Sequence, residues 1–315
     1  MSNNPKYTFL LPAYKARYFE EALRSIQAQT CRDFRVLVSD DCSPEELRPV
    51  FDRVCGDDER FAFRRNAENI GGRSLVAHWN LLVGLCDSEW LIMASDDDVF
   101  EPTFLEELDR LQTKYPEVDM LRARVRSIND EGETLAEDAR YDEHVDRLGF
   151  FYQKHFNNAL RCIANYAFRT EALKAKGGFV EFPLAWYSDD ASVLMMAEHG
   201  CANTEQMLFN FRSSDESISS RKLSERDAFR KATATVFFDH WFQETMASLR
   251  ADSPQTTFAR LRLEFAQGGH DRFMHEQFSY MSSNCTFADF LRLLRLRPAG
   301  NRVRLLRNYL SARLR

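Results

Sequence analysis

The stretch WLIMASDDDVFEP, residues 90–102, places three consecutive aspartates directly after a run of apolar residues. The apolar run has the length and composition of a buried strand. Ionised carboxylates packed this closely repel one another, and each needs water, a hydrogen-bond donor or a cation nearby. Asp96, Asp97 and Asp98 therefore indicate either a solvated turn or a divalent-cation site at the carboxyl end of a strand. Taken alone, the stretch favours neither.

The composition is that of a folded, reduced protein. The chain has 315 residues, enough for one large domain or two smaller ones, and its 44% hydrophobic content argues against wholesale disorder. A net charge of −6 argues against nucleic acid as the main partner. Seven cysteines without a C-x-x-C pair are typical of free thiols in the cytosol. No segment resembles a signal peptide or a bilayer span, so we expect a cytoplasmic protein, either soluble or peripheral on the inner face of the membrane.

Apolar strands alternate with amphipathic helices along the first hundred residues. Strands are predicted at Tyr7–Leu11, 34–41, 61–66 and 89–94, and helices at 19–30 and 74–86. Strands and helices that alternate through short connections predict a mostly parallel sheet covered on both faces. The expected fold class is therefore α/β.

Polar residues follow three of these strands, at Pro12–Tyr14, Asp40–Asp41 and Asp96–Asp98. In open α/β sheets, ligands bind at the carboxyl ends of the strands, so we expect these three groups to gather along one edge. Their convergence favours a binding site over three unrelated turns.

The second half of the chain has fewer clear patterns. The charged stretch 129–147 predicts a variable loop, and the serine-rich stretch 211–222 predicts another. Asp189 and Asp190 open an apolar helix, where acidic residues are often only caps, and the pair in isolation favours capping. From about Ser224 onward the sequence is helical in character.

Taken together, these segments resemble the family 2 glycosyltransferases, which have the GT-A fold. The family's first strand, Pro-x-Tyr, helix ending in Gln-Thr and Asp-Asp-x-Ser are matched by FLLPAYKARYFEEALRSIQAQTCRDFRVLVSDDCSPEE. Its Asn-x-Gly segment, asparagine-bearing helix and aspartate motif closed by proline are matched by ENIGGRSLVAHWNLLVGLCDSEWLIMASDDDVFEP. Its Gly-Gly-Phe, acid-Asp and apolar helix are matched by GGFVEFPLAWYSDDASVLMMAEHG. The resemblance covers residues 6–222, with the motifs in the family's order.

The resemblance implies a nucleotide-diphosphate sugar donor, and we expect a UDP-sugar. The residues that match the family's donor pocket are Pro12, Ala13, Tyr14, Asp41, Arg73 and Asp96. By this matching Asp41 accepts the N–H of the base, Asp96 lies near the ribose, and Arg73 is a candidate contact for the base or the diphosphate. Asp40 supports the pocket beside Asp41.

The resemblance also implies a divalent cation, Mn²⁺ or Mg²⁺. A sugar diphosphate and a bare carboxylate cluster would repel each other, and a cation bridges them. Counting back from Pro102, the family's metal-ligand aspartate falls on Asp97, with Asp98 beside it. The family often has a further aspartate where this chain has Ser95, which leaves the exact ligand set open.

Asp190 aligns with the family's catalytic base, and this outweighs the capping interpretation. Inverting transfer needs a carboxylate on the acceptor side to take the proton of the attacking hydroxyl. Asp189 either positions the acceptor or caps the helix. The 211–222 stretch resembles the loop that closes over the donor, and its cations either contact phosphate or face solvent. They are Arg212, Arg221 and Lys222.

We expect a GT-A catalytic domain over residues 1–224 and a helical C-terminal region over residues 225–315. Residues 287–315 carry eight arginines and one acid, with leucines at near-helical spacing. Basic amphipathic helices can lie on anionic lipid, which is the interpretation we favour for this tail. The alternative is that the leucines pack on the catalytic domain while the arginines cover its acidic surface.

The function that we expect is sugar transfer to a hydroxyl of a lipid-linked or growing surface glycan. A sugar nucleotidyltransferase would need a glycine-rich phosphate loop after the first strand, and PAYKARYF has no glycine. A signalling receiver domain would carry its acidic pair after the first strand and would not need Asp96–Asp98. A degenerate, non-catalytic relative that binds glycans or nucleotide sugars stays open, because all the required acids are present.

Overall fold

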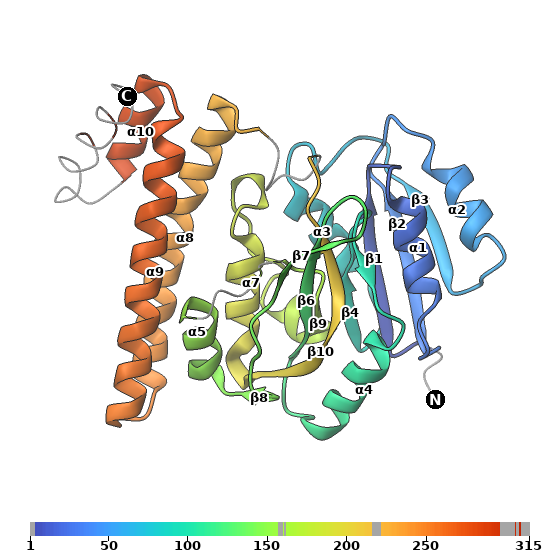
Figure 1. The fold of residues 1–315 in the computed structure, drawn as a ribbon, viewed down its shortest axis with the longest axis horizontal. Helices are drawn as coiled ribbons and strands as arrows, with labels where there is room; N and C mark the ends of the chain where they lie inside the picture. The colour runs from blue at the N-terminus through green and yellow to red at the C-terminus, as the bar shows by residue number, and fades with distance from the viewer. Residues whose placement is uncertain are drawn as a thin grey trace.

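The computed structural model describes residues 4–156, 160, 162–215, 222–296, 306 and 309. Within these ranges, a ten-stranded sheet with the strand order β3-β2-β1-β4-β9-β6-β10-β5 forms the centre, and β7 and β8 join it at β6 and β10. Helices cover the sheet, and a long helical hairpin stands beside it (Figure 1).

The first half of the chain confirms the predicted alternation of strands and helices. Its elements are β1 (Tyr7–Ala13), α1 (Phe19–Gln27), β2 (Phe34–Asp40), α2 (Leu47–Cys55), β3 (Phe61–Arg65), α3 (Leu75–Leu85) and β4 (Trp90–Met93). The neighbouring pairs β3-β2, β2-β1 and β1-β4 are all parallel, so the carboxyl ends of these strands share one edge. Helix α2 was not predicted from the sequence.

Strand β1 continues past Pro12, where the sequence predicted its end. Its ladder with β4 stops at the pair Leu10–Met93, whereas its ladder with β2 continues to Ala13. Alternate residues of a strand direct their backbone groups to the same side, so Pro12 faces the β4 side, as Leu10 does. At that point β4 has already ended, and the missing N–H of Pro12 has no partner strand there. The proline therefore removes no ladder hydrogen bond.

The second half of the chain is mixed. Its elements are β5 (Val99–Phe100), α4 (Phe104–Lys114), β6 (Met120–Ile128), β7 (Thr134–Glu137), β8 (His144–Val145), α5 (Arg147–Phe156), β9 (Tyr166–Arg169), α6 (Thr170–Ala175), η1 (Pro183–Ala185), α7 (Ser188–Met196), η2 (Ala197–His199) and β10 (Cys201–Arg212). Strand β9 lies antiparallel between β4 and β6, and β10 pairs parallel with β6.

Two sequence predictions for this half need correction. The stretch 129–147 contains β7 and β8 rather than only a loop, and the stretch predicted as a loop from residue 211 begins inside β10. Strand β10 lacks a clear alternation of apolar and polar residues because its register against β6 shifts between Asn203 and Phe209. A bulge of this kind breaks the period of two by which a strand is recognised.

The C-terminal region is helical, as predicted, with α8 (Glu225–Asp252), α9 (Thr257–Ser283) and α10 (Phe287–Leu296). The side chains of Ser224 and Thr256 cap α8 and α9 by accepting backbone N–H groups three residues ahead. Gly269 lets α5 approach α9 closely, since a Cβ there would lie 2.8 Å from the carbonyl oxygen of His155.

Successive strand residues point to opposite faces of the sheet and therefore supply two cores. Phe9 and Trp90 belong to the core beneath α1 and α4, whereas Leu10 and Leu91 belong to the core on the other face. That second core also contains Phe238 of α8, so the sheet and the helical hairpin share packing. Helix α8 begins at the domain boundary predicted after residue 224, and this boundary stays a prediction.

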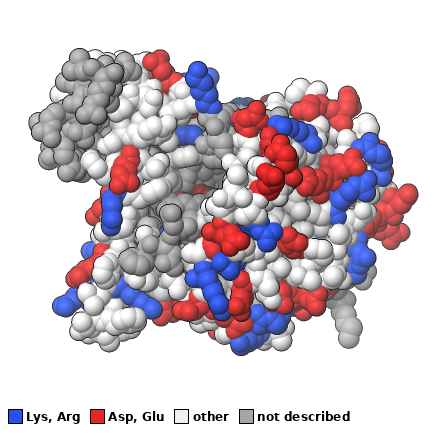
Figure 2. Space-filling model, in the orientation of Figure 1, with Lys and Arg blue, Asp and Glu red and all other residues white. Residues whose placement is uncertain are grey.

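Charged residues of both signs are interspersed over the face shown in Figure 2. Among the helices in the described ranges, none combines the length and the hydropathy that crossing a bilayer requires.

Candidate active site

The loops after β1, β2 and β4 meet at the carboxyl edge of the sheet. Asp96 Oδ2 accepts the backbone N–H groups of Tyr14 and Lys15, both at 2.7 Å. The Ser43 hydroxyl, just after β2, donates to the Tyr14 carbonyl oxygen at 2.6 Å. These bonds join the three polar segments that the sequence predicted to converge.

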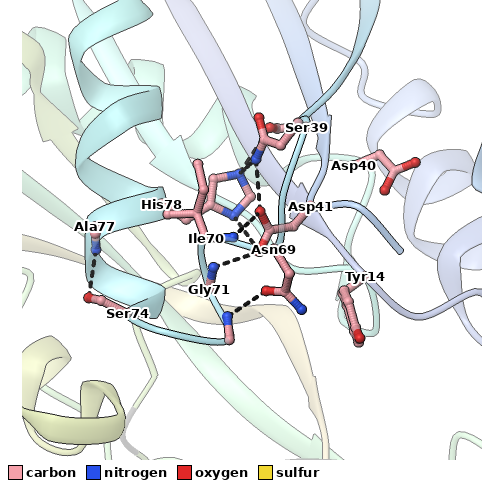
Figure 3. A network of polar contacts seen from close by, with 12 residues as sticks. Tyr14, Ser39, Asp40, Asp41, Asn69, Ile70, Gly71, Ser74, Ala77 and His78 are labelled. Carbon is pink, nitrogen blue, oxygen red and sulfur yellow. Dashed lines mark hydrogen bonds and ion pairs between the residues drawn. The ribbon is translucent and has the colours of Figure 1, made fainter. Parts of the chain in front are cut away.

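Asp41 is buried at this edge and holds the loop that precedes α3 (Figure 3). Its carboxylate accepts hydrogen bonds from the backbone N–H groups of Ile70 and Gly71, at 3.0 and 2.7 Å, and from the Asn66 side chain at 2.8 Å. His78 Nδ1 lies 3.7 Å from Asp41 Oδ2, too far for a hydrogen bond. A carboxylate offers about four acceptor positions, so the three hydrogen bonds leave room for a further donor. This geometry suits the predicted contact with a base N–H.

His78 of α3 anchors the same network from beneath. Its Nε2 lies 2.9 Å from Ser39 Oγ and 3.2 Å from Asn66 Nδ2. Burial lowers the pKa of His78, so the ring is neutral near pH 7. The network ties α3 to the end of β2, which places Asp41 and the loop before α3 in a fixed relation.

The other predicted donor-pocket residues differ in accessibility. The Tyr14 side chain is 41% exposed and lies beside the Asp41 network, whereas Ala13 is buried in β1. Asp40 is buried, pairs with Arg65 and accepts the Ser43 N–H at 2.8 Å, which is a supporting role. Arg73 forms an exposed ion pair with Glu68 at the surface.

The aspartate cluster after β4 is buried and crowded. Asp98 accepts the backbone N–H of Arg212 at 2.8 Å and the hydroxyl of Ser95, whereas the Asp97 carboxylate contacts the Lys15 ammonium. Burial and the neighbouring Asp97 raise the pKa of the Asp98 carboxyl. Burial likewise raises the pKa of Asp96, against the opposing effect of Lys15.

These side chains fit a divalent cation. Mg²⁺ typically binds through one or two carboxylates and completes its coordination with substrate phosphates and water. Asp97 and Asp98 supply two adjacent carboxylates in a site where burial disfavours unpaired negative charge. Within the described ranges, no group of three or more His, Cys, Asp or Glu side chains is arranged to hold a metal. A cation held by Asp97 and Asp98 would therefore need substrate phosphates and water to complete its coordination.

The sequence suggested that Arg212 either contacts phosphate or faces solvent. The structure shows neither, because Arg212 is buried at the end of β10. Its Nε donates to the Asp97 carbonyl oxygen at 3.0 Å, and its two terminal nitrogens donate to Asn129 O at 2.9 Å and Glu21 Oε2 at 2.7 Å. It therefore braces the aspartate loop instead of facing a phosphate or solvent. Lys222 is exposed, and Arg221 lies outside the described residues.

The second acidic pair opens α7, and its two carboxylates do different things. Asp189 lies in the first turn of α7, where its Oδ1 accepts the backbone N–H of Asp190 at 2.8 Å. Asp190 is 2% exposed, and its Oδ1 lies 2.7 Å from Nζ of Lys154, a residue of α5 that is 5% exposed. The contact is an ion pair by distance rather than a well-aligned hydrogen bond.

The Cys162 thiol donates to Asn165 Oδ1 at 3.1 Å. Desolvation raises the pKa of this thiol, and the negative charges of Asp98 and Asp189 raise it further.

Sequence reasoning missed two cations of the site, Lys15 and Lys154. Lys15 follows the Pro-x-Tyr segment directly, so its proximity to the aspartates could have been inferred once Tyr14 was placed at the same edge. Lys154 lies in a stretch that matches no motif, and only the packing of α5 against α7 reveals its partner.

The sheet order and the aspartate-bearing loops are those of the GT-A fold. The chain belongs to glycosyl transferase family 2, since the family model matches residues 8–175, more than half of its length. The family resemblance noted from the motifs is thereby confirmed.

Several known proteins are similar to this chain. An uncharacterized glycosyltransferase of Methanocaldococcus jannaschii is 25% identical over 122 residues, which cover 38% of this chain and 41% of that protein. The match thus spans less than half of that curated relative. S. aureus TarS 1–349, in complex with UDP-GlcNAc, has a TM-score of 0.67 at 15% identity and covers 98% of this chain and 90% of its own.

A second solved structure extends the comparison. The mannosyltransferase PcManGT from Pyrobaculum calidifontis, in complex with GDP-Man and Mn²⁺, has a TM-score of 0.53 at 15% identity, with coverage of 100% of this chain and 82% of its own. At these identities the two structures show that the fold is shared, including the helical C-terminal region.

Proposed function

We propose that this protein transfers a sugar, with inversion, from a UDP-sugar donor to a hydroxyl of a lipid-linked or growing surface glycan. Family membership supports sugar transfer, and solved proteins of the same fold hold UDP-GlcNAc or GDP-Man. The observation that carries the proposal is that the Asp41 pocket and the Asp96–Asp98 loop meet at the carboxyl edge of the sheet.

The donor is assigned to the pocket lined by Pro12, Ala13 and Tyr14. Asp41 has an acceptor position left for an N–H of the base. The exposed ring of Tyr14 can stack on the same base. Asp96 holds the backbone that carries Tyr14, so its predicted position near the ribose is compatible with a bridging role. Arg73 would reach the donor only by leaving Glu68.

Asp97 and Asp98 are the residues that would hold Mn²⁺ or Mg²⁺. Such a cation supplies positive charge beside the diphosphate and so stabilises it as a leaving group. A solved protein with this fold contains Mn²⁺. Arg212 keeps the Asp97–Asp98 backbone in place by bonding to the carbonyl oxygen of one residue and the carboxylate of the other.

Asp190 is assigned as the general base. In the reaction the acceptor hydroxyl oxygen forms a bond to the anomeric carbon, while the bond from that carbon to the phosphate oxygen breaks. The nucleoside diphosphate leaves with the electron pair of the broken bond, and the hydroxyl proton passes to the Asp190 carboxylate. Lys154 holds that carboxylate at the start of α7, and Asp189 remains beside it as a cap or an acceptor contact.

The protein is further proposed to act in the cytoplasm at an anionic membrane surface, reached through its basic C-terminal tail. Helix α10 buries Phe290, Leu293 and Leu294 against α8 and α9, so part of the tail's apolar face is used in packing. The same cluster contains residues of α8 and α9, and Trp186, which precedes α7, packs against it. Phe287 and Leu291 stay exposed beside Arg292 and can contact lipid.

The base assignment is tested by comparing Asp190→Asn with its neighbour Asp189→Asn. Donors are first identified by the thermal stabilisation that each nucleotide sugar gives the wild-type protein with Mn²⁺. We expect Asp190→Asn to reduce transfer by about 10²–10⁴-fold, the usual contribution of a positioned base, while UDP affinity barely changes. Asp189→Asn should keep most of the transfer.

Near-wild-type transfer by Asp190→Asn would overturn the assignment, and so would an equal loss in both variants. A wild-type protein that binds UDP tightly yet transfers no sugar to any glycan acceptor and hydrolyses no donor would instead favour the non-catalytic alternative.

A further inference from the structure

Lys15 brings a positive charge into the aspartate cluster. Its ammonium contacts Asp97 Oδ2 and lies 3.7 Å from Asp96 Oδ1. Its backbone is held in the same place, since the Lys15 N–H donates to Asp96 Oδ2 at 2.7 Å. The side chain is 26% exposed, so it borders the open side of the site.

The other contacts of Asp96, Asp97 and Asp98 bring no second cation to the Asp96 and Asp97 carboxylates among the described residues. Asp98 is occupied by the backbone N–H of Arg212 and by the Ser95 hydroxyl. The buried Arg212 guanidinium bonds to the Asp97 carbonyl oxygen and not to its carboxylate. Among the described residues, Lys15 is the one cation within ion-pair distance of the Asp96 and Asp97 carboxylates.

We propose that Lys15 is an exchangeable counter-ion of the donor site, which competes with the divalent cation for Asp97 and moves to the donor diphosphate when both ligands bind. This rests on the proposed function, because it takes Asp97 as a metal ligand. An ammonium and a divalent cation on one carboxylate repel each other, so the bound metal displaces Lys15. Lysine suits the exchange, with three donors on a flexible four-carbon stem.

The exchange has two consequences for binding. The divalent cation alone binds against the resident ammonium, whereas a nucleotide diphosphate alone is attracted by that ammonium. When both bind, Lys15 leaves the carboxylate to the metal and pairs with phosphate, so each ligand strengthens the binding of the other. Such coupling is reciprocal by thermodynamic necessity.

The test uses Lys15→Met, which removes the charge and keeps much of the stem, and Lys15→Arg, which keeps a cation. The matched control is Lys6→Met, because Lys6 is 24% exposed and pairs with Asp109 away from the site. Mn²⁺ affinity is measured by calorimetry without nucleotide, and UDP affinity is measured in EDTA. We expect Lys15→Met to bind Mn²⁺ about tenfold more tightly and UDP about tenfold more weakly, the order of one charge-assisted contact.

Lys6→Met and Lys15→Arg should both stay within about threefold of wild type in each measurement, less than the tenfold effect of one such contact. Unchanged or weaker Mn²⁺ binding by Lys15→Met, or unchanged UDP binding in EDTA, would overturn the counter-ion role while leaving the proposed function intact. A wild-type protein that binds neither Mn²⁺ nor UDP would overturn both. Lys15→Gln provides a second neutral variant should the methionine substitution impair folding.

Discussion

Adjacent acidic residues in this protein perform different duties. Asp40 pairs with Arg65, whereas Asp41 organises the loop before α3. Asp96 holds the backbone of Tyr14 and Lys15, whereas Asp97 meets only a lysine side chain among the described contacts of its carboxylate. The local backbone differs as well, since Asp40 is the last residue of β2 and Asp41 lies just beyond it, whereas Asp96 and Asp97 lie in the loop between β4 and β5.

The buried Lys154–Asp190 pair leads to a prediction about stability. Removing one partner of a buried ion pair leaves the other charge without its counter-ion and typically costs about 3–5 kcal/mol. We expect Lys154→Met to lower the free energy of unfolding by that order, because both side chains are buried and 2.7 Å apart. The double variant Lys154→Met/Asp190→Asn should recover much of the loss. Urea unfolding of the single and double variants measures the coupling.

Additive losses in that double-mutant cycle would show that the two charges do not interact. The matched substitution Lys176→Met, at an ion pair with the half-exposed Glu198, should cost well under about 1 kcal/mol, as expected of a surface pair.

Among the elements, strand β10 and helix α10 each have two roles. Strand β10 completes the second half of the sheet, and its last residue, Arg212, braces the aspartate loop. Helix α10 closes a small core with Phe290 and Leu293 while presenting Phe287, Leu291 and its arginines to the outside. Both elements thus connect a packing role to a surface or a site.

The lipid role of α10 is testable by charge reversal. Deleting the whole tail would remove Phe290 and Leu293 and expose the apolar residues of α8 and α9 that they cover, so point substitutions are cleaner. We expect Arg292→Glu with Arg295→Glu to weaken binding to phosphatidylserine vesicles at least tenfold, since each cation near an anionic surface contributes about 1 kcal/mol. Vesicle co-sedimentation at low and high salt measures the effect, and salt should screen the wild-type binding.

The control reverses Arg250 and Arg260, which are exposed at the opposite end of the α8–α9 hairpin (Figure 1). Equal vesicle binding by the wild-type protein and the α10 variant would support a purely structural tail.

Across the whole molecule, the helical hairpin and the sheet stabilise each other and the site. Phe238 of α8 is fully buried and stacks on Tyr187 at 5.0 Å between ring centroids. Tyr187 has a positive φ of 69° and directly precedes α7. A residue other than glycine whose backbone adopts this left-handed conformation is strained, and the conformation persists only because the surrounding structure holds it. The hairpin therefore helps to place Asp189 and Asp190.

We expect Phe238→Ala to lower the free energy of unfolding by about 3–5 kcal/mol, the cost of removing a buried aromatic ring. Sugar transfer should fall as well, even at temperatures where the variant stays folded, because the support of Tyr187 is lost. The neighbouring Phe237 is 42% exposed, and Phe237→Ala should change stability by less than about 0.5 kcal/mol. Chemical unfolding and transfer assays on both variants check this. A Phe238→Ala protein with wild-type transfer would contradict the link between the hairpin and the site.

The amino-acid sequence alone was sufficient to predict the strands β1 to β4, the helices α1 and α3, and the edge at which the strands meet. Apolar runs interrupted by amphipathic helices predicted the parallel strands β1 to β4, and the order of these strands placed Tyr14, Asp41 and Asp96 at one edge. The motifs were sufficient to recognise the family. Patterns of this kind are readable because they depend on residues close together in the chain.

The partners of the charged residues, in contrast, could be identified only in the folded molecule. Arg212 contacts Asp97 and Asp98 from 115 and 114 residues away, and Lys154 meets Asp190 across the contact of α5 with α7. The bulged strand β10 also escaped detection, because its irregular register hides the period of two. Such pairings depend on how distant elements pack, and burial gives them their strength, so no local pattern in the chain encodes them.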